Sequence, residues 1–240
     1  MRAKELSVLN FKLRHFHKDI ILMTVRWCLA YSLSYRDIEE MMVERNIRVD
    51  HSTLNRWVIK YSEQLEEKFR KKYKRQTGYS WRMDETYIKI KGQWHYLYRA
   101  VDKGGDTIDF MLNEKRDKKA AFDFFCKSIG NNGLPDKVTI DKSGSNLSAL
   151  ETINHFLYLV ALFGFQFFQI EIRQIKYLNN RIEQDHRGIK RITKPMMGFK
   201  AFGSARSTLA GIELHRMLRK GQHKLNDKIS LFDQFYGLAA

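Results

Sequence analysis

The sequence has few cysteines and lacks a long apolar segment. Cys28 and Cys126 are the only cysteines among 240 residues, and each lies in an apolar, helical pattern. This argues against a disulfide framework and a cysteine-based zinc site, and it indicates a reducing compartment. The longest apolar run, 156–165, is about half as long as a membrane-spanning helix, and the amino terminus lacks the pattern of a secretory signal. We therefore expect a soluble intracellular protein.

The charge is strongly positive and unevenly distributed. The formal net charge is +16. Residues 1–76 carry 17 Lys and Arg against 10 Asp and Glu, and residues 171–224 carry 13 against 4, whereas residues 77–170 carry 12 against 11. A chain of this length can form one core and a smaller second unit. Basic flanks around a more acidic middle favour nucleic acid as the partner, although a basic composition also serves solubility alone.

Residues 1–76 are predicted to be helical. Ser34 and Asp37 fit a capping box, in which two side chains satisfy backbone N–H groups of the first helical turn, so a helix is expected over 35–44. A second helix is expected from Ser52, because apolar residues recur there at spacings of three and four. These residues are Leu54, Trp57, Val58 and Tyr61.

The opposite face of this second helix is polar and basic. It carries Thr53, Asn55, Arg56 and Lys60. Two short helices joined by a tight turn, the second with polar and basic residues near its start, match a helix-turn-helix that reads the major groove of DNA. An ordinary helical hairpin with a solvated face fits the same pattern. The charged stretch 66–75 is predicted to be a linker. Three of its lysines are predicted to contact the DNA backbone, namely Lys71, Lys72 and Lys74.

From Gly78 onward the apolar residues alternate, as they do in strands. Strands are predicted at 87–91 and 94–98, around a turn at Gly92-Gln93, and a third follows Gly104-Gly105. Further along, the patterns predict a helix at 117–129, a strand at 137–140, a helix from 148, a strand at 166–174 and a helix from 180. Three strands followed by helix, strand, helix, strand and helix form the ribonuclease-H-like arrangement, an α/β fold in which helices cover both faces of a mixed sheet.

Three carboxylates fall where such a fold can hold a metal. Asp84 lies in the first and central strand, Asp141 ends the fourth strand, which should be its neighbour, and Glu183 lies near the start of the last helix. Oxygen ligands without cysteine or paired histidine suit Mg²⁺ or Mn²⁺ better than zinc. Two such ions can activate an attacking hydroxyl and stabilise the leaving oxygen of a phosphodiester.

Each carboxylate also has an ordinary structural interpretation. Because neighbours in a strand point to opposite faces, only one of Asp84 and Glu85 can face the site. Asp141 can be a turn residue, and Glu183 can be part of a capping box with Asn180. The metal-site hypothesis therefore depends on the joint placement of the three residues.

The last predicted helix carries basic residues on the same face as Glu183. Lys190 follows Glu183 by seven residues, almost two turns, so both project from one side. We expect Glu183 to bind metal and Lys190 to contact phosphate, with His186 and Arg187 as further DNA contacts between them. A solvated charged face is the alternative.

Seven short motifs follow one another along most of the chain. They are MDETYI at 83–88, YLYRAVD at 96–102, TIDKSG at 139–144, RQIKYLNN at 173–180, EQDHR at 183–187, MGFK at 197–200 and AGIE at 210–213. Together they resemble the core of a bacterial insertion-sequence transposase of insertion sequence family six, within the DDE transposases and integrase-core proteins.

The resemblance implies an activity and its residues. The catalytic triad of the family falls on Asp84, Asp141 and Glu183, and its downstream basic residue on Lys190. Mg²⁺ or Mn²⁺, as two ions, would support cleavage at the element ends and transfer of the 3′-hydroxyl into target DNA, often with cointegrate formation. The implied partners are double-stranded DNA, as terminal inverted repeats and as target, and further protomers in a synaptic complex. The implied location is the bacterial cytoplasm, at the nucleoid.

The expected organisation has three parts. A helix-turn-helix region is predicted at 1–76, a ribonuclease-H-like DDE catalytic domain at 77–195 and a helical tail at 196–240. The tail contains an apolar stripe, formed by Ala210, Leu214, Met217 and Leu218, and Gly221 marks its end. We expect the stripe to pack on its own domain, with self-association as the alternative.

The chain departs from the family in one place. Between Asp141 and Glu183 lie 41 residues, more than the family usually has, and the extra length falls in the aromatic-rich stretch 154–169. We expect a lengthened helix that ends at Gly164 and buries these side chains against the sheet, so that Glu183 still reaches the two aspartates. An inactive or repurposed copy that binds repeat DNA is the main alternative. A structure-specific nuclease of the same fold is disfavoured by the helix-turn-helix.

Overall fold

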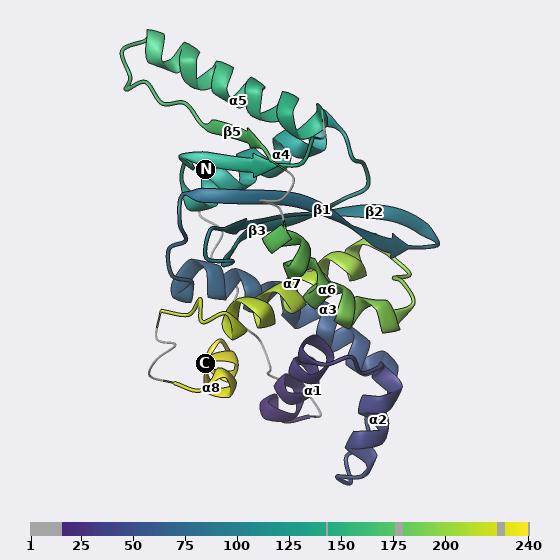
Figure 1. Ribbon diagram of the computed structural model, residues 1–240. Helices are drawn as coiled ribbons and strands as arrows, with labels where there is room; N and C mark the ends of the chain where they lie inside the picture. The colour runs from purple at the N-terminus through teal and green to yellow at the C-terminus, as the bar shows by residue number, and fades with distance from the viewer. Residues whose placement is uncertain (1–15, 143, 176–179, 225–228, 240) are drawn as a thin grey trace. The chain divides into compact units, whose positions relative to one another are not determined.

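The chain divides into two compact units. The computed structural model describes residues 16–142, 144–175, 180–224 and 229–239. One unit, Gln76–Arg187, contains the sheet, and the other joins Met1–Arg75 with Gly188–Ala240 and is helical where it is described (Figure 1). The N-terminal and C-terminal segments therefore share one helical unit. The first division, after Arg75, lies one residue from the predicted boundary at 76, whereas the second, after Arg187, lies eight residues before the predicted end of the catalytic domain at 195.

The helical unit begins with three helices, α1 (Lys18–Ala30), α2 (Tyr35–Val43) and α3 (His51–Lys68). The predicted capping box is confirmed: the Ser34 hydroxyl accepts from the Asp37 N–H, and the Asp37 carboxylate accepts from the Ser34 N–H at 2.7 Å. The predicted apolar face of α3 is buried. The helix starts one residue earlier than predicted because Asp50 caps it, accepting from the backbone N–H groups of Ser52 and Thr53.

The prediction that 66–75 is a linker is wrong. α3 continues into a π-helical turn, η1 (Phe69–Tyr73), and Phe69 is completely buried. Lys74 then forms an isolated β-bridge with His223, which stacks on Tyr73 at 5.1 Å between ring centroids. Leu65 and Phe69 continue the apolar spacing of α3, so the many charges of this stretch lie on the remaining faces of a packed helix.

The C-terminal part of the helical unit contains a short helix, η3 (Lys194–Met196), then α7 (Phe202–Arg219) and α8 (Leu231–Gly237). α7 is buried on most of its sides and packs on α3 and α1. At Gly211 a Cβ would come within 2.6 Å of side-chain atoms of Leu29 and Ser62, so a larger residue would force these buried side chains to shift. The predicted apolar stripe therefore packs inside its own unit, and Gly221, with φ of +68°, follows the helix end.

The sheet unit has the predicted ribonuclease-H-like topology. Its strands are β1 (Ser80–Ile90), β2 (Gln93–Asp102), β3 (Thr107–Asn113), β4 (Lys137–Ile140) and β5 (Glu171–Gln174), in the order β3-β2-β1-β4-β5. β1 is central, antiparallel to β2 and parallel to β4, as expected. The first hairpin turns at Lys91-Gly92, one residue before the predicted position, with φ of +48° and +79°. Two positive φ values are typical of the tight hairpin turn whose twist matches the strands.

Three helices accompany the sheet: α4 (Lys118–Asn132), α5 (Gly144–Leu162) and α6 (Asn180–Thr193). α4 contributes Phe124 and Phe125 to the core, and the first half of α5 contributes Leu150 and Ile153. They pack on the strand residues Trp81, Met83, Tyr98 and Val138. α6 crosses from the sheet unit into the helical unit at Gly188.

The expectation that the aromatic stretch is buried is wrong. α5 is lengthened as predicted, and Gly164, with φ of +88°, follows its end. Beyond Ile153, however, no residue of this described stretch is buried before Ile170. The 19 residues of α5 rise roughly 28 Å, about twice the length of the four-residue strands β4 and β5. Leu157 and Phe168 still pack against the edge of the core, but most of the large apolar side chains of this stretch are exposed. β5 starts at Glu171 instead of the predicted 166.

Within the described part of the chain, no helix is both long enough and apolar enough to cross a bilayer.

The buried His215 generates a prediction about pH. It lies in α7 at 3% exposure, and its Nε2 makes no hydrogen bond with the described residues. Burial, together with Arg26, Arg219 and Arg216, lowers the pKa of His215 to about 4 from 6.5. Because the unfolded chain binds this proton first, stability falls as the pH decreases from 6.5 towards 4.

His215→Gln should remove this pH dependence. We expect wild type to lose up to about 3 kcal/mol more than the variant between neutral pH and pH about 4, measured by chemical denaturation. His155→Gln, at an exposed position, serves as the control and should follow wild type. Parallel curves for wild type and His215→Gln would contradict the assigned cause.

Candidate active site

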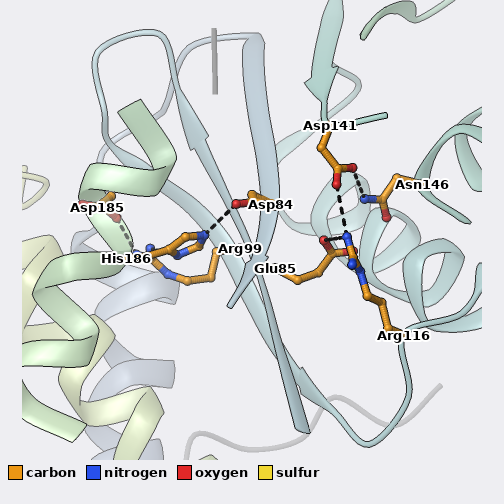
Figure 2. Close-up of polar contacts among 8 residues, drawn as sticks. All are labelled: Asp84, Glu85, Arg99, Arg116, Asp141, Asn146, Asp185 and His186. Atoms are coloured by element: carbon orange, nitrogen blue, oxygen red, sulfur yellow. Dashed lines mark hydrogen bonds and ion pairs between the residues drawn. The ribbon is translucent and has the colours of Figure 1, made fainter. Parts of the chain in front are cut away.

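The central strand β1 places two adjacent carboxylates at the candidate site. Asp84 pairs across the sheet with Arg99 of β2, and Glu85 pairs with Tyr98. Strand alternation directs the side chains of Asp84 and Glu85 to opposite sides, and Figure 2 shows Asp84 towards His186 and Glu85 towards Arg116.

Asp141 joins the two β1 carboxylates. It directly follows β4, which runs parallel to β1. One carboxylate oxygen from each of Asp84, Glu85 and Asp141 lies within 4.8 Å of the other two, and all three residues are partly buried. The predicted pairing of the first and fourth strands thus brings Asp84 and Asp141 together. Sequence reasoning missed Glu85 because alternation separates it from Asp84, whereas Asp141 lies beyond its strand end and approaches both.

An arginine binds one half of this group. Arg116 Nη2 lies 3.2 Å from Glu85 Oε2 and 3.1 Å from Asp141 Oδ2. Asn146 Nδ2 donates to Asp141 Oδ1 at 3.4 Å (Figure 2). Burial raises the pKa of Glu85, and the charge of Arg116 opposes this shift. The other oxygen, Glu85 Oε1, is buried and makes no hydrogen bond with the described residues.

These residues fit a hard divalent cation. The donors are carboxylate oxygens, which Mg²⁺ and Mn²⁺ prefer. Three carboxylates in one partly buried group concentrate negative charge, which a divalent cation offsets. Arg116 already neutralises part of this charge, so a cation would compete with its ion pairs.

The other half of the site is a chain of polar contacts from Asp185 to Asp84. Asp185 accepts from Arg99, Arg99 Nη1 lies 3.1 Å from His186 Nδ1, and His186 Nε2 lies 3.3 Å from Asp84 Oδ2 (Figure 2). A guanidinium can only donate, so it requires an acceptor at Nδ1, which places the imidazole proton on Nε2 for donation to Asp84. Arg99 is fully buried. Its contact with His186, and that of His186 with Asp84, fix the orientation of the Asp84 carboxylate.

The structure places the predicted α6 residues in different environments. His186, predicted as a DNA contact, is 5% exposed between Arg99 and Asp84, and its ring faces that carboxylate. Glu183 is exposed and is not part of the acidic group. Glu183 and His186 are three residues apart, on the same side of α6 one turn from each other. Arg187 and Lys190 are exposed.

The predicted recognition residues lie at the start of α3 and on its solvent side. Thr53 Oγ1 donates to Asp50 Oδ2 at 2.7 Å, and Arg56 Nη2 donates to Thr53 Oγ1 at 2.7 Å. Arg56 is exposed, and Asn55 and Lys60 are half-buried. Lys60 lies over the Tyr61 ring at 5.2 Å.

The predicted backbone-contacting lysines lie beyond α3. Lys71 and Lys72 are exposed in η1, where Lys71 pairs with Glu67 at 2.6 Å. Lys74 is half-buried at the β-bridge to His223. A bound phosphate would therefore have to compete with an ion pair at Lys71.

Comparison with known proteins gives the family. A family model for the DDE domain of IS240-type transposases matches residues 78–222. The transposase of the insertion sequence-like element IS431mec from Staphylococcus aureus is 41% identical over 217 residues, which cover 90% of this chain and 91% of the relative. The chain belongs to the DDE transposases of insertion sequences. The transposase of IS257 in transposon Tn4003, also from Staphylococcus aureus, is 40% identical over the same length.

Solved structures resemble this transposase more distantly. The catalytic core of BIV integrase gives a TM-score of 0.42 at 17% identity, covering 58% of this chain and 84% of that one. The HTLV-2 integrase catalytic core in complex with magnesium gives 0.38 at 16% identity, covering 68% and 84%. The strand order itself identifies the fold.

The neighbours His186 and Arg187 allow a matched test of the polar chain. We expect His186→Ala to raise the Mg²⁺ concentration needed for half-maximal DNA cleavage by roughly 10-fold or more, because loss of a group that orients a metal ligand typically costs this much. Its affinity for DNA should change little. Arg187→Ala should instead weaken DNA binding without changing the Mg²⁺ requirement. The reverse pattern would return His186 to the role of a DNA contact.

Proposed function

We propose that this transposase binds the terminal inverted repeats of its insertion sequence, cleaves DNA at the element ends and transfers the 3′-hydroxyl into target DNA with divalent cations. The observation that carries the proposal is the approach of Asp84 and Asp141 within the matched DDE domain. Carboxylates from adjacent parallel strands supply the negative charge and the oxygen donors that a catalytic Mg²⁺ needs.

The proposed triad is Asp84, Asp141 and Glu183. Two observations support the inclusion of Glu183: it shares one side of α6 with His186, and His186 contacts Asp84. Lys190, four residues after His186 on the same helix, would contact phosphate. Bound cations, two in this proposal, would activate the attacking hydroxyl and stabilise the leaving oxygen. His186 and Arg99 hold Asp84 in place for this role.

DNA recognition is proposed for the helices α2 and α3. Asn55 and Arg56 near the start of α3 would read bases, with Thr53 and Lys60 beside them, whereas Lys71, Lys72 and Lys74 would contact phosphates. Arg187 and Lys190 on α6 would contact DNA phosphates. Because two element ends must be joined, we propose that more than one protomer acts in the synaptic complex. The proposed place of action is the bacterial cytoplasm, at the nucleoid.

Substitution of each triad residue tests the catalytic part. Asp84→Asn, Asp141→Asn and Glu183→Gln should each reduce Mg²⁺-dependent cleavage and transfer by more than roughly 100-fold, since loss of a ligand exceeds the loss of a group that orients one. Binding to a terminal-repeat duplex should stay within about twofold of wild type. A variant that retains substantial transfer activity would remove that residue from the triad.

Separate substitutions in the helical unit test DNA recognition. Arg56→Ala should lower the preference for the terminal repeat over random DNA by ~1 to 3 kcal/mol, the value of a bidentate base contact. The combined substitution of Lys71, Lys72 and Lys74 by alanine should weaken binding to every sequence and reduce its salt dependence. Fluorescence anisotropy over a salt series measures both effects. Equal losses on repeat and random DNA for Arg56→Ala would contradict the helix-turn-helix assignment.

One observation favours a second candidate, a repeat-binding protein without catalytic activity. Glu183 is exposed and outside the acidic group. A nicking assay on terminal-repeat DNA distinguishes the two candidates. Divalent-metal-dependent nicking supports the transposase, and repeat binding with no nicking in Mg²⁺ or Mn²⁺ supports the second candidate.

A further inference from the structure

An apolar arm projects from the sheet unit. We define the arm as residues 155–169, the second half of α5 and the segment that returns towards β5. Eight of its large apolar side chains are between 37% and 83% exposed. They are Phe156, Tyr158, Leu159, Val160, Leu162, Phe163, Phe165 and Phe167. Figure 1 shows this part of α5 extending past the end of the sheet.

The arm is held at its base by a reciprocal pair of hydrogen bonds. Asn154 Nδ2 donates to the Ile170 carbonyl at 2.9 Å, and the Ile170 N–H donates to Asn154 Oδ1 at 2.9 Å. Ile153 and Ile170 are both buried in the core next to this pair. The arm is thus a projection from a fixed base, and its apolar residues occur on every side of the helix, so one surface of its own sheet cannot cover them.

The chemistry of the arm argues against the DNA backbone as its partner. No charged residue occurs between Glu151 and Glu171, in a chain whose net charge is +16. A surface that binds phosphates needs lysine or arginine, and an amphipathic helix that lies on a membrane needs a charged face opposite its apolar one. A surface this apolar is typical of the interface of a permanent homodimer.

We propose that the arm is the contact surface with a second copy of this chain. At about 150–250 Å² for an aromatic side chain, the exposed fractions of the eight residues amount to roughly 900 Å² per copy. Each partner of a standard-size interface contributes about 800 Å². The exposed apolar surface of the arm is therefore of the size that one partner contributes to a stable dimer.

Charge at the base of the arm selects the antiparallel arrangement. An open hollow of about 460 Å³ lies there, lined by Lys118, Lys119, Phe122, Thr152 and Phe156. Lys119 is paired with Asp123 at 2.9 Å, but parallel arms would bring the Lys118 side chains of the two copies together, and such like-charge contacts disfavour association. Antiparallel arms about a twofold axis place the uncharged tip of one copy, with Phe163, over the hollow of the other. The middle of each arm, near Val160, then lies at the axis.

The dimer proposal names the surface at which the protomers of a synaptic complex would meet. The role given to the dimer therefore rests on the proposed function. The dimer itself requires neither DNA nor metal. Its formation is therefore measured independently of cleavage.

Charge substitutions at the most exposed arm residues test the dimer. Sedimentation velocity of the full chain without DNA, over a micromolar concentration series, should show a dimer for wild type. Phe163→Glu and Phe165→Glu should each raise its dissociation constant by at least about 10-fold, as loss of a central interface contact does. The control Trp94→Glu changes an exposed aromatic residue of the same unit outside the arm, and it should associate as wild type does. Thermal melting verifies that all three variants are folded.

A cysteine cross-link tests the arrangement. In a Cys126→Ser background, which removes the exposed native thiol, Val160→Cys should form a disulfide-linked dimer under mild oxidation, and Phe163→Cys should not. Cross-linking at Phe163 instead would overturn the antiparallel arrangement.

Three outcomes would overturn the dimer proposal. They are a wild-type monomer throughout the concentration series, a dimer that the two charge variants leave unchanged, and a monomer that binds phosphatidylglycerol vesicles through the arm. If Asp84→Asn loses DNA cleavage but still forms the dimer, the dimer proposal stands. If the wild-type protein is a monomer that cleaves DNA, the dimer proposal is refuted and the proposed function is not.

Discussion

The parallel pairing of β1 with β4 is the constraint on which the site depends. It sets Ser80–Arg82 beside Lys137–Thr139, so that the β1 residues beyond the paired segment and the first residue after β4 meet at the same place. Asp84 and Asp141 approach each other for this reason, although 56 residues separate them in the sequence. A shift of one residue in β1 would turn Asp84 to the opposite face, and a shift in β4 would displace Asp141, so the register of the core determines the chemistry.

The second constraint is the burial of charge beside Asp84. Arg99 is completely buried and carries a charge that must be compensated. Asp185 on α6 compensates this charge, and the neighbouring His186 accepts a hydrogen bond from Arg99 and donates one to Asp84. The start of α6 is thereby fixed to the strand that bears the first carboxylate. The same helix carries Glu183 and Lys190, so one buried arginine aligns the helix on which the remaining proposed catalytic residues lie.

The patterns that the sequence predicts well are local ones. The Ser34–Asp37 capping box and the buried face of α3 follow from spacing alone, and the order of strands and helices is sufficient for the topology. The Arg99–His186–Asp84 chain was missed because it joins residues from two elements, and no local pattern marks a buried arginine as paired. The burial of the 154–169 stretch was predicted wrongly. Hydrophobicity indicates that a segment needs a packing partner, but it does not say which surface provides it. The lengths of α5, β4 and β5 show that the sheet is too short to cover the whole stretch.

The identity of the third metal ligand is the most direct test of the catalytic mechanism proposed here. Glu85 lies with Asp84 and Asp141 and is paired with Arg116, whereas Glu183 lies on α6 one turn from His186. Mg²⁺-dependent cleavage of a terminal-repeat duplex should be compared in Glu183→Gln and Glu85→Gln, both verified as folded. We expect Glu183→Gln to abolish cleavage and Glu85→Gln to retain most of it. Loss of cleavage in Glu85→Gln together with retention in Glu183→Gln would contradict the assignment of the triad.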